Sequence, residues 1–280
     1  MRRAPNLSIF LVQIARMKDI SEKVFWITGA SSGIGEALAY ALGRMGCRLI
    51  LSSREKASLE KVKSKCATPD KVNIIELDLA DTSNMGVLAQ HAIALFGRVD
   101  VLVNNAGVSQ RSVVAQTSLH VYKKLMDINY LGTVALTKAI LPHFIERKEG
   151  YFVTVSSLMG KFGSPQRSGY CAAKHALHGF FDVLRMEHQR DGIYVTMICP
   201  GFVNTEIAMN ALTSDGSPKR SNDHRTSGGM APGKFAEKMI RAMRRRKFEA
   251  YIGGSEVAGV YLKRFFPRLL HWAVLRSRVT

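Results

Sequence analysis

The sequence predicts an α/β protein built as one domain around a doubly wound, Rossmann-like parallel β-sheet with helices on both faces. Two observations favour this fold. Short runs rich in Val, Ile and Leu alternate with longer amphipathic stretches, and a Gly-rich turn follows the first of these runs. Strands that are apolar on both sides are typical of parallel sheets covered by helices on each face. A chain of 280 residues is long enough to give such a domain a full core.

Seven short apolar segments are predicted to be strands: 23–28, 48–52, 72–77, 101–104, 151–156, 193–199 and 248–252. Helices are predicted between them, at about 34–45, 55–66, 82–96, 118–147, 170–191 and 233–247. The alternation continues without a linker, as in a doubly wound sheet. We therefore expect one catalytic domain over residues 21–254, with an extension at 1–20 and a tail at 255–280.

Two regions break the alternation. Residues 203–232 are rich in Ser, Thr, Asn, Gly and Pro, and a loop this long in a compact domain is usually functional, so we expect a lid over the substrate. Near the N-terminus, the apolar patch 7–15 resembles a short signal segment, but no small-residue cleavage site follows it. The patch is also too short to span a bilayer, and we expect residues 1–16 to be an extension rather than a cleaved signal.

The net charge of +18 is concentrated at the C-terminus, because residues 234–280 hold twelve Lys and Arg but three Glu. Residues 255–280 mix these cations with Phe, Leu and Trp, and Pro267 interrupts any single long helix. This tail is predicted either to lie on a membrane surface or to pack on its own domain or a neighbouring subunit. No basic groove interleaved with aromatic residues indicates nucleic-acid binding. The four cysteines form no C-x-x-C pair, so we expect a cytoplasmic protein with no metal site.

The first predicted strand ends in the segment Thr28–Gly35, whose glycines have the spacing G-x-x-x-G-x-G. Glycines at such a turn let the backbone approach a pyrophosphate, which the N-terminus of the next helix then faces. The second strand ends in Ser53 and Arg54, at the place where NAD-binding proteins carry an acidic residue that holds the ribose hydroxyls. A guanidinium can instead grip the adenosine phosphate of NADP(H), and we expect that cofactor.

Tyr170 and Lys174 lie four residues apart on a predicted helix, so their side chains share one face. A cation beside a tyrosine favours the phenolate, which suits proton transfer to or from an alcohol or ketone near neutral pH. Ser157 precedes Tyr170 by thirteen residues. Such a Tyr–Lys pair is common by chance, and its meaning comes from the motifs around it.

Taken together, these motifs resemble the short-chain dehydrogenase/reductase family, in its compact single-domain type, across about residues 22–253. The resemblance is carried by Thr28–Gly35, Asp78-Leu79, Asn104–Gly107, Asn129, Ser157, Tyr170, Lys174 and Pro200-Gly201. The fuller segments 109–112 (S-Q-R-S), 129–133 and 170–177 are closest to the branch that holds membrane-associated dehydrogenase/reductases and relatives of the hydroxysteroid dehydrogenases.

The resemblance implies a role for each matching residue. Tyr170 exchanges a proton with the substrate, Ser157 holds the carbonyl oxygen, Lys174 contacts the nicotinamide ribose and lowers the pKa of Tyr170, and Asn129 anchors a water in a proton relay. The substrate would contact Ser157, Leu158 and Met159. The implied cofactor site comprises Thr28, Gly29, Ser31, Ser32, Gly33, Ile34, Gly35, Ser53, Arg54, Asp78, Leu79, Asn105, Ala106, Gly107, Tyr170, Lys174, Pro200, Gly201, Val203 and Thr205.

The expected function is therefore reduction of a carbonyl, or oxidation of the matching alcohol, with NADP(H). Leu158, Met159, Phe162, Met209 and Leu212 predict an apolar pocket for a lipid-like or steroid-like ketone or aldehyde. Basic residues at 219–225 leave a ketoacyl-thioester substrate as an alternative, and a non-catalytic NADP-binding scaffold is a further one. By analogy with the family, we expect a homodimer or homotetramer formed through the helices at 118–147 and 170–191.

Overall fold

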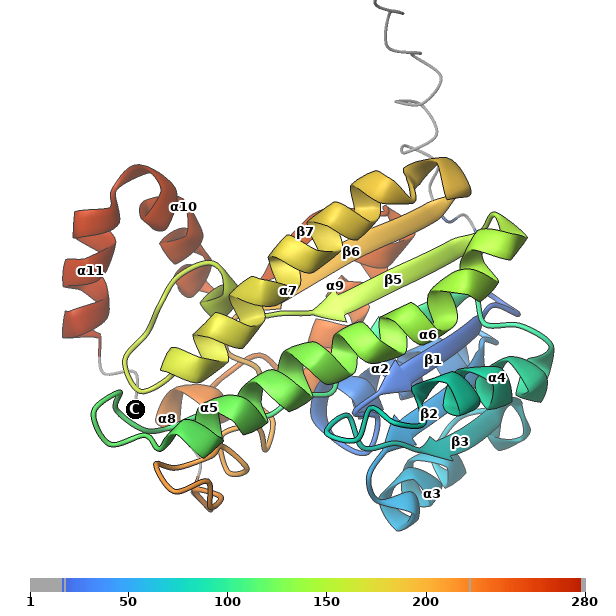
Figure 1. Ribbon diagram of the computed structural model, residues 1–280, viewed down its shortest axis with the longest axis horizontal. Coiled ribbons are helices and arrows are strands. Elements are labelled where there is room, and N and C mark those ends of the chain that lie inside the picture. The colour runs from blue at the N-terminus through green and yellow to red at the C-terminus, as the bar shows by residue number, and fades with distance from the viewer. Residues whose placement is uncertain (1–16, 18, 222, 278–280) are drawn as a thin grey trace, which may run out of the picture.

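The computed structural model describes Met17 and residues 19–221 and 223–277, and the predicted strands form one sheet. The strands are β1 (Val24–Thr28), β2 (Arg48–Ser53), β3 (Val72–Glu76), β4 (Val101–Asn104), β5 (Gly150–Val155), β6 (Ile193–Pro200) and β7 (Glu249–Ile252). Their order is β3-β2-β1-β4-β5-β6-β7, and every pairing is parallel (Figure 1). The predicted doubly wound sheet is confirmed.

Helices cover both faces of the sheet, because its central strands are apolar on both sides. The helices that flank it are α2 (Gly33–Arg44), α3 (Lys56–Ser64), α4 (Met85–Phe96), α5 (Leu119–Met126), α6 (Gly132–Arg147), α7 (Ser168–Glu187) and α9 (Pro232–Arg244). One core joins the sheet to α2, α3 and α9, and a second core joins its other face to α4, α6 and α7. Each large side chain buried there contributes roughly 1.5–3 kcal/mol.

The predicted helix over 118–147 is not continuous. A π-helical turn, Asp127–Leu131, separates α5 from α6. Such turns are wider than an α-helix and are frequent at functional sites. This one turns the side chain of Asn129 toward the loop after β4, where both of its polar atoms bond to the backbone of Val108.

The end of the chain is folded onto the domain. Helices α10 (Ala258–Phe265) and α11 (Pro267–Arg276) form a pair at the carboxyl-terminal end of the strands (Figure 1). Pro267 is the first residue of α11, so it separates two helices as predicted. The segment 203–232 is irregular apart from α8 (His224–Ser227) and the beginning of α9. Among the described residues, no helix is both long and apolar enough to cross a bilayer.

At the other end of the chain, Met17 and Ile20 are buried against the core that contains α9. The backbone N–H of Met17 donates to the carbonyl of Arg244 at 3.0 Å. The domain therefore begins a few residues before the predicted boundary at residue 21. The rest of the predicted extension, residues 1–16, lies outside the described residues.

Candidate active site

One cavity of about 1000 Å³ lies at the carboxyl ends of the strands, where parallel α/β sheets bind their ligands. The cavity opens between β1 and β4, where the strand order of the sheet reverses. Of the residues to which the family resemblance assigned a role with cofactor, substrate or catalysis, all line this cavity except Gly35 and Asn129. The structure thus brings together residues that are spread over most of the chain.

The Gly-rich turn has the shape that a phosphate site needs. Gly29 has φ +63°, and a Cβ there would lie 2.8 Å from the Cα of Ala106. A Cβ on Gly35 would lie 2.2 Å from the carbonyl oxygen of Gly29, so Gly35 packs the helix onto the turn instead of lining the cavity. Ser32 and Gly33 begin α2 at the cavity wall, and the unpaired N–H groups of that first turn suit an anion.

Thr28 and Asn105 join the two loops at the bottom of the cavity. The hydroxyl of Thr28 accepts hydrogen bonds from the backbone N–H groups of Asn105 at 3.0 Å and of Ala106 at 3.1 Å. The Asn105 side chain donates to the carbonyls of Thr28 at 2.9 Å and Gly29 at 3.0 Å. Both residues were predicted to bind the cofactor, and the structure shows that their side chains mainly fix the shape of its site.

The end of the cavity near β2 and β3 carries the residues predicted to hold the adenosine. Arg54 is exposed directly after β2, and Asp78 accepts a hydrogen bond from the N–H of Ala80 at 3.0 Å, so its carboxylate also caps a turn. Glu55 lines the same end and accepts from the hydroxyl of Ser58 at 3.0 Å. Glu55, the residue after Arg54 in the chain, was not among the residues predicted for this end of the cavity.

Ser157 and Tyr170 meet at the substrate side. Ser157 starts a 3-10 turn, Leu158–Gly160, and its hydroxyl accepts from the N–H of Met159 at 3.1 Å. Tyr170 lies in the first turn of α7, and the Ser157 hydroxyl is near enough to its phenol to lower the pKa of that phenol. Two neighbouring hydroxyls that are nearly buried at a cavity wall can hold one carbonyl oxygen between them.

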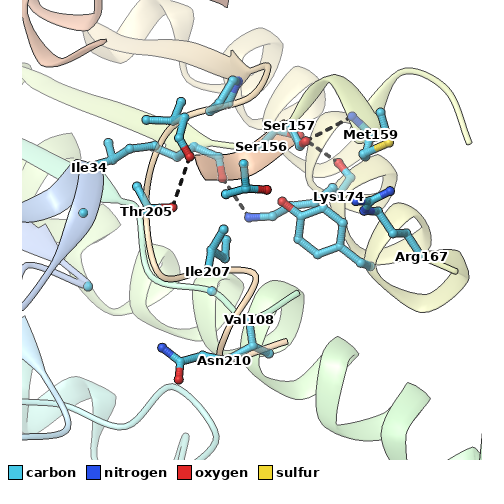
Figure 2. Close-up of a pocket in the computed structure, with 18 of the residues that line it drawn as sticks. Ile34, Val108, Ser156, Ser157, Met159, Arg167, Lys174, Thr205, Ile207 and Asn210 are labelled. Atoms are coloured by element: carbon cyan, nitrogen blue, oxygen red, sulfur yellow. Dashed lines mark hydrogen bonds between the residues drawn. The ribbon is translucent and has the colours of Figure 1, made fainter. Parts of the chain in front are cut away.

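Lys174 lies one helical turn after Tyr170, with its amine 5.8 Å from the centre of the phenol ring. The amine donates to the carbonyl of Val155 at 2.8 Å, and burial lowers its pKa to about 8. Figure 2 shows Lys174, Ser157 and Arg167 around one part of the cavity, with Ile207 and Asn210 of the lid facing them.

In the protein alone, the pKa of Tyr170 is raised above its ordinary value. Burial causes this rise, which outweighs the lowering by the nearby Ser157 hydroxyl and by the charges of Arg111 and Arg167. The lowering of this pKa by Lys174 stays a prediction. The guanidiniums were missed as neighbours of Tyr170, since no local pattern connects them to it.

Asn129 is fully buried behind the cavity. Its amide donates to the carbonyl of Val108 and accepts from the same residue's N–H, both at 2.9 Å. A Cβ on Gly107 would lie 2.6 Å from the Asn129 oxygen and 3.4 Å from the Lys174 amine, so Gly107 is what lets these two groups approach. The Asn129 side-chain oxygen has a second lone pair, which could accept a further hydrogen bond. The water relay through Asn129 stays a prediction.

The last residue of β6 and the segment after it form the wall predicted for the nicotinamide: Pro200, Gly201, Val203 and Thr205. The N–H of Gly201 donates to the carbonyl of Ile252 at 2.9 Å, which continues the sheet toward β7. Glu256 accepts from the N–H of Phe202 at 3.0 Å, and a Cβ on Gly201 would meet its carboxylate at 2.0 Å. Glu256 lies in the predicted tail, so sequence reasoning did not find this support.

The substrate end is apolar, and the C-terminal helices complete it. Leu158, Met159 and Phe162 line it as predicted, together with Leu212 of the lid, while Met209 does not reach it. The helix pair and the residue after it add Gly259, Leu262, Leu270, Ala273, Val274 and Ser277. The tail was predicted as a separate segment, and its contribution to the cavity wall was missed. The apolar residues at 270, 273 and 274 share one side of a helix, and this spacing could have indicated a buried face.

Comparison with known proteins agrees with this geometry. The family described as short chain dehydrogenase matches residues 23–215. The chain belongs to this family. A human protein named dehydrogenase/reductase SDR family member 7 is 42% identical over 261 residues, which cover 91% of this chain and 77% of the human one. The bovine SDR family member 7B is 38% identical over 268 residues, covering 92% of this dehydrogenase and 82% of its relative.

Solved structures show the same architecture. A short-chain dehydrogenase from Streptomyces avermitilis has a TM-score of 0.79 at 30% identity and covers 93% of this chain and 99% of its own. A short-chain dehydrogenase/reductase from Burkholderia phymatum, solved in complex with NAD, also has a TM-score of 0.79, at 23% identity, with 90% of this chain and 96% of its own covered. The second likeness concerns the fold alone. As a member of the family, this chain is an oxidoreductase that uses a nicotinamide cofactor.

Proposed function

We propose that this dehydrogenase uses NADP(H) to interconvert an apolar ketone or aldehyde and its alcohol. The observation that carries the proposal is that Ser157 and Tyr170 line the same cavity as the Gly-rich turn. The fit of the cofactor rests on that turn, where any Cβ on Gly29 or Gly35 would collide with backbone. When bound, the nicotinamide supplies or accepts the hydride.

In the reduction, Tyr170 donates its proton to the carbonyl oxygen, and Ser157 donates a hydrogen bond to the same oxygen as its negative charge develops. Both side chains line one cavity, so a single carbonyl oxygen can contact both hydroxyls. Lys174, with its lowered pKa, can return a proton toward the site from the side of Gly107. In the oxidation, the same groups act in the reverse sense.

Arg54 supports NADP(H) over NAD(H), because a guanidinium next to the adenosine ribose can bind its phosphate with two hydrogen bonds. The test is Arg54→Gln, with Glu55→Gln as the matched control at the adjoining residue. We expect Arg54→Gln to raise the Kd of NADPH about 10- to 100-fold, the worth of hydrogen bonds to a charged group, and to leave NADH binding unchanged. Equal affinity of the wild type for NADH and NADPH would contradict the choice of cofactor.

The apolar end of the cavity supports a lipophilic substrate. Two of the basic lid residues that favoured a ketoacyl thioester have neighbours inside the protein: Lys219 pairs with Asp223 at 2.5 Å, and the Arg225 guanidinium lies 5.8 Å from the centre of the Phe202 ring. A panel of lipophilic ketones, aldehydes and ketoacyl-CoA esters, followed by NADPH oxidation, separates the two substrate classes. Turnover of the thioesters alone would contradict the proposal of a lipophilic substrate. No turnover of any carbonyl would favour a non-catalytic NADP-binding scaffold.

The outer face of the helix pair supports contact with a membrane surface. Its exposed side chains are apolar or aromatic: Tyr261, Phe265, Phe266, Leu269, Trp272 and Leu275. Lys263, Arg264, Arg268 and Arg276 are interspersed with them. Helices with this composition bind the interface of a bilayer, and the cations favour anionic lipids. We therefore propose a peripheral contact with an anionic leaflet, made by the same helices that line the substrate end.

Sedimentation with vesicles tests this contact. Vesicles of phosphatidylcholine and phosphatidylserine should bind the wild type and release it as salt rises. The double variant Leu269→Asp, Trp272→Asp changes exposed side chains only and should abolish sedimentation while activity on a water-soluble carbonyl is kept. Unchanged sedimentation of the double variant would contradict the membrane proposal. If the double variant instead loses its oligomeric state, the outer face of the helix pair binds a second copy of the chain.

A homodimer or homotetramer through α5, α6 and α7 is also proposed. Leu131, Val183 and Met186 are exposed apolar side chains of these helices or of the π-helical turn between α5 and α6. Light scattering of Val183→Arg should show a smaller species than the wild type. A wild type that is already monomeric would contradict this assembly.

A further inference from the structure

The segment Ser109–Ser112 follows β4, and no step of the proposed reaction uses its side chains. Its four side chains are polar, yet all four are buried or nearly so; Gln110 has no exposed surface, and the Arg111 side chain is 5% exposed. Buried polar groups are costly unless hydrogen-bonded. Their partners are the start of α7 and the lid, which are the two parts of the protein that flank Tyr170.

Gln110 holds the first turn of α7. Its side-chain oxygen accepts from the backbone N–H of Gly169 at 2.8 Å and of Tyr170 at 3.3 Å. N–H groups in a first helical turn have no partner within the helix, and the N-cap residue Arg167 supplies no side-chain cap here. The amide nitrogen of Gln110 donates to the hydroxyl of Ser112 at 3.1 Å, which fixes the orientation of the amide. Gln110 therefore sets where Tyr170 lies.

Arg111 holds the lid. Its Nε and one terminal nitrogen donate to the same oxygen of Asp223, at 2.7 and 2.5 Å, and Asp223 is buried. Its backbone N–H donates to the carbonyl of Leu212 at 2.8 Å, while the N–H of Leu212 donates to the carbonyl of Ser109 at 2.9 Å. The lid is thus fastened to this segment by an ion pair and by two backbone hydrogen bonds.

Positive charge exceeds negative charge at this junction. Arg167, just before α7, lies 3.5 Å from the oxygen of Asp223 that Arg111 binds, and Lys219 lies 2.5 Å from its other oxygen. Three cations therefore share one carboxylate. Arg111 and Arg167 also line the cavity, on the wall that includes Tyr170.

The groups that act on the phenol of Tyr170 can be named. Arg111 and Arg167 are the cations that lower its pKa; the nearby Ser157 hydroxyl also lowers it, and burial and the thiol of Cys171 raise it. Lys174 lies beside the ring at 5.8 Å. The carboxylate of Asp223 offsets part of the effect of the two guanidiniums, because it lies between them.

We propose that Gln110 and Arg111 are positioning residues for Tyr170, and that Asp223 links closure of the lid to the placement and the charge environment of this phenol. The proposal rests on the proposed function, since it assumes that Tyr170 transfers the proton. It also gives the S-Q-R-S segment a role, because this segment connects the start of α7, which carries Tyr170, to the lid that closes the cavity.

The charge part is tested by two variants with opposite expected signs. Reduction needs the protonated phenol, so its kcat falls as pH rises through the pKa of Tyr170. Asp223→Asn leaves the guanidiniums unbalanced and should move this midpoint down by about 0.5 pH unit; Arg111→Met removes a cation and should move it up by about as much. Arg220→Gln, which removes an exposed cation from the same lid, is the control and should not move it.

The positioning part is tested at Gln110. Gln110→Met cannot accept the two N–H groups and should lower kcat at least tenfold, with the Kd of NADPH unchanged. Gln110→Glu keeps an acceptor and should restore most of that loss. Equal losses in the two variants would show that Gln110 only supports the fold.

An ultraviolet titration of the phenol, taken as the difference between each protein and its Tyr170→Phe counterpart, gives the same midpoints without turnover. Midpoints that do not move, or that move in the same direction for Asp223→Asn and Arg111→Met, would overturn the charge proposal. If the wild type reduces no carbonyl, the proposed function fails, while the titration still decides the role of Asp223 and Arg111.

Discussion

The two ends of the cavity are built in different ways. The cofactor end is made from turns that directly follow β1, β2 and β4, and its shape depends on a few glycines whose neighbours are backbone atoms. The substrate end is assembled from the turn after β5, the lid and α10–α11, which are distant in sequence. The cofactor end is therefore fixed by local geometry, whereas the substrate end depends on the packing of side chains from separate segments.

The largest effect is expected where both ends meet, at Tyr170. Tyr170→Phe removes the proton donor and keeps the ring, so kcat should fall about 10²- to 10⁴-fold, the usual worth of general acid–base catalysis. The Kd of NADPH should change less than twofold. Tyr194→Phe, at the far end of β6, is the control and should keep full activity; a comparable loss there would remove the basis for assigning the proton to Tyr170.

The next effect concerns the cofactor end alone. Gly35→Ala places a Cβ 2.2 Å from the carbonyl oxygen of Gly29, so the turn must shift. We expect the Kd of NADPH, measured by calorimetry, to rise more than tenfold, together with a lower Tm. The matched change Gly179→Ala meets no atom within 4 Å and should stabilise α7 by about 0.5–1 kcal/mol. Unchanged NADPH binding in Gly35→Ala would show that this turn does not shape the phosphate site.

A smaller effect is expected at the substrate end. Leu270 is 7% exposed and lines the cavity, whereas Leu269, its neighbour in α11, is 50% exposed and faces outward. Leu270→Ala should raise KM for a lipophilic carbonyl about tenfold, from the loss of apolar contact area, and leave the Kd of NADPH unchanged. Leu269→Ala should alter neither value. If the two variants behave alike, α11 is not part of the substrate wall.

The smallest effect is on stability. Because burial lowers the pKa of Lys174 to about 8, the folded state bears the cost of the buried charge below that pH. Between about 8 and the ordinary value near 10.5 the unfolded chain still binds a proton that the folded chain has lost, so stability rises with pH. Lys174→Met should therefore raise Tm at pH 7, by about 2–4 °C per kcal/mol gained. The gain should shrink toward pH 10; a gain that does not depend on pH would contradict a charged Lys174.

The sequence predicted the sheet, the seven strands and nearly all of the cofactor end, because Gly-rich turns and apolar strands are local patterns. It missed the π-helical turn at Asn129, since the pattern of α5 and α6 continues through it. It also missed the inner face of α11 and the guanidiniums near Tyr170. Those positions follow from where the lid and the chain end pack, and no short segment of sequence specifies that packing.

The most direct test of the account follows the hydride. The wild type is incubated with a lipophilic ketone and NADPH that carries deuterium at the reactive position of its nicotinamide, and the alcohol is analysed by mass spectrometry. We predict one deuterium on the former carbonyl carbon, and at least a hundredfold less product in the same time with Tyr170→Phe. Product without the label, or NADPH that binds and is never consumed with any carbonyl, would contradict the central claim.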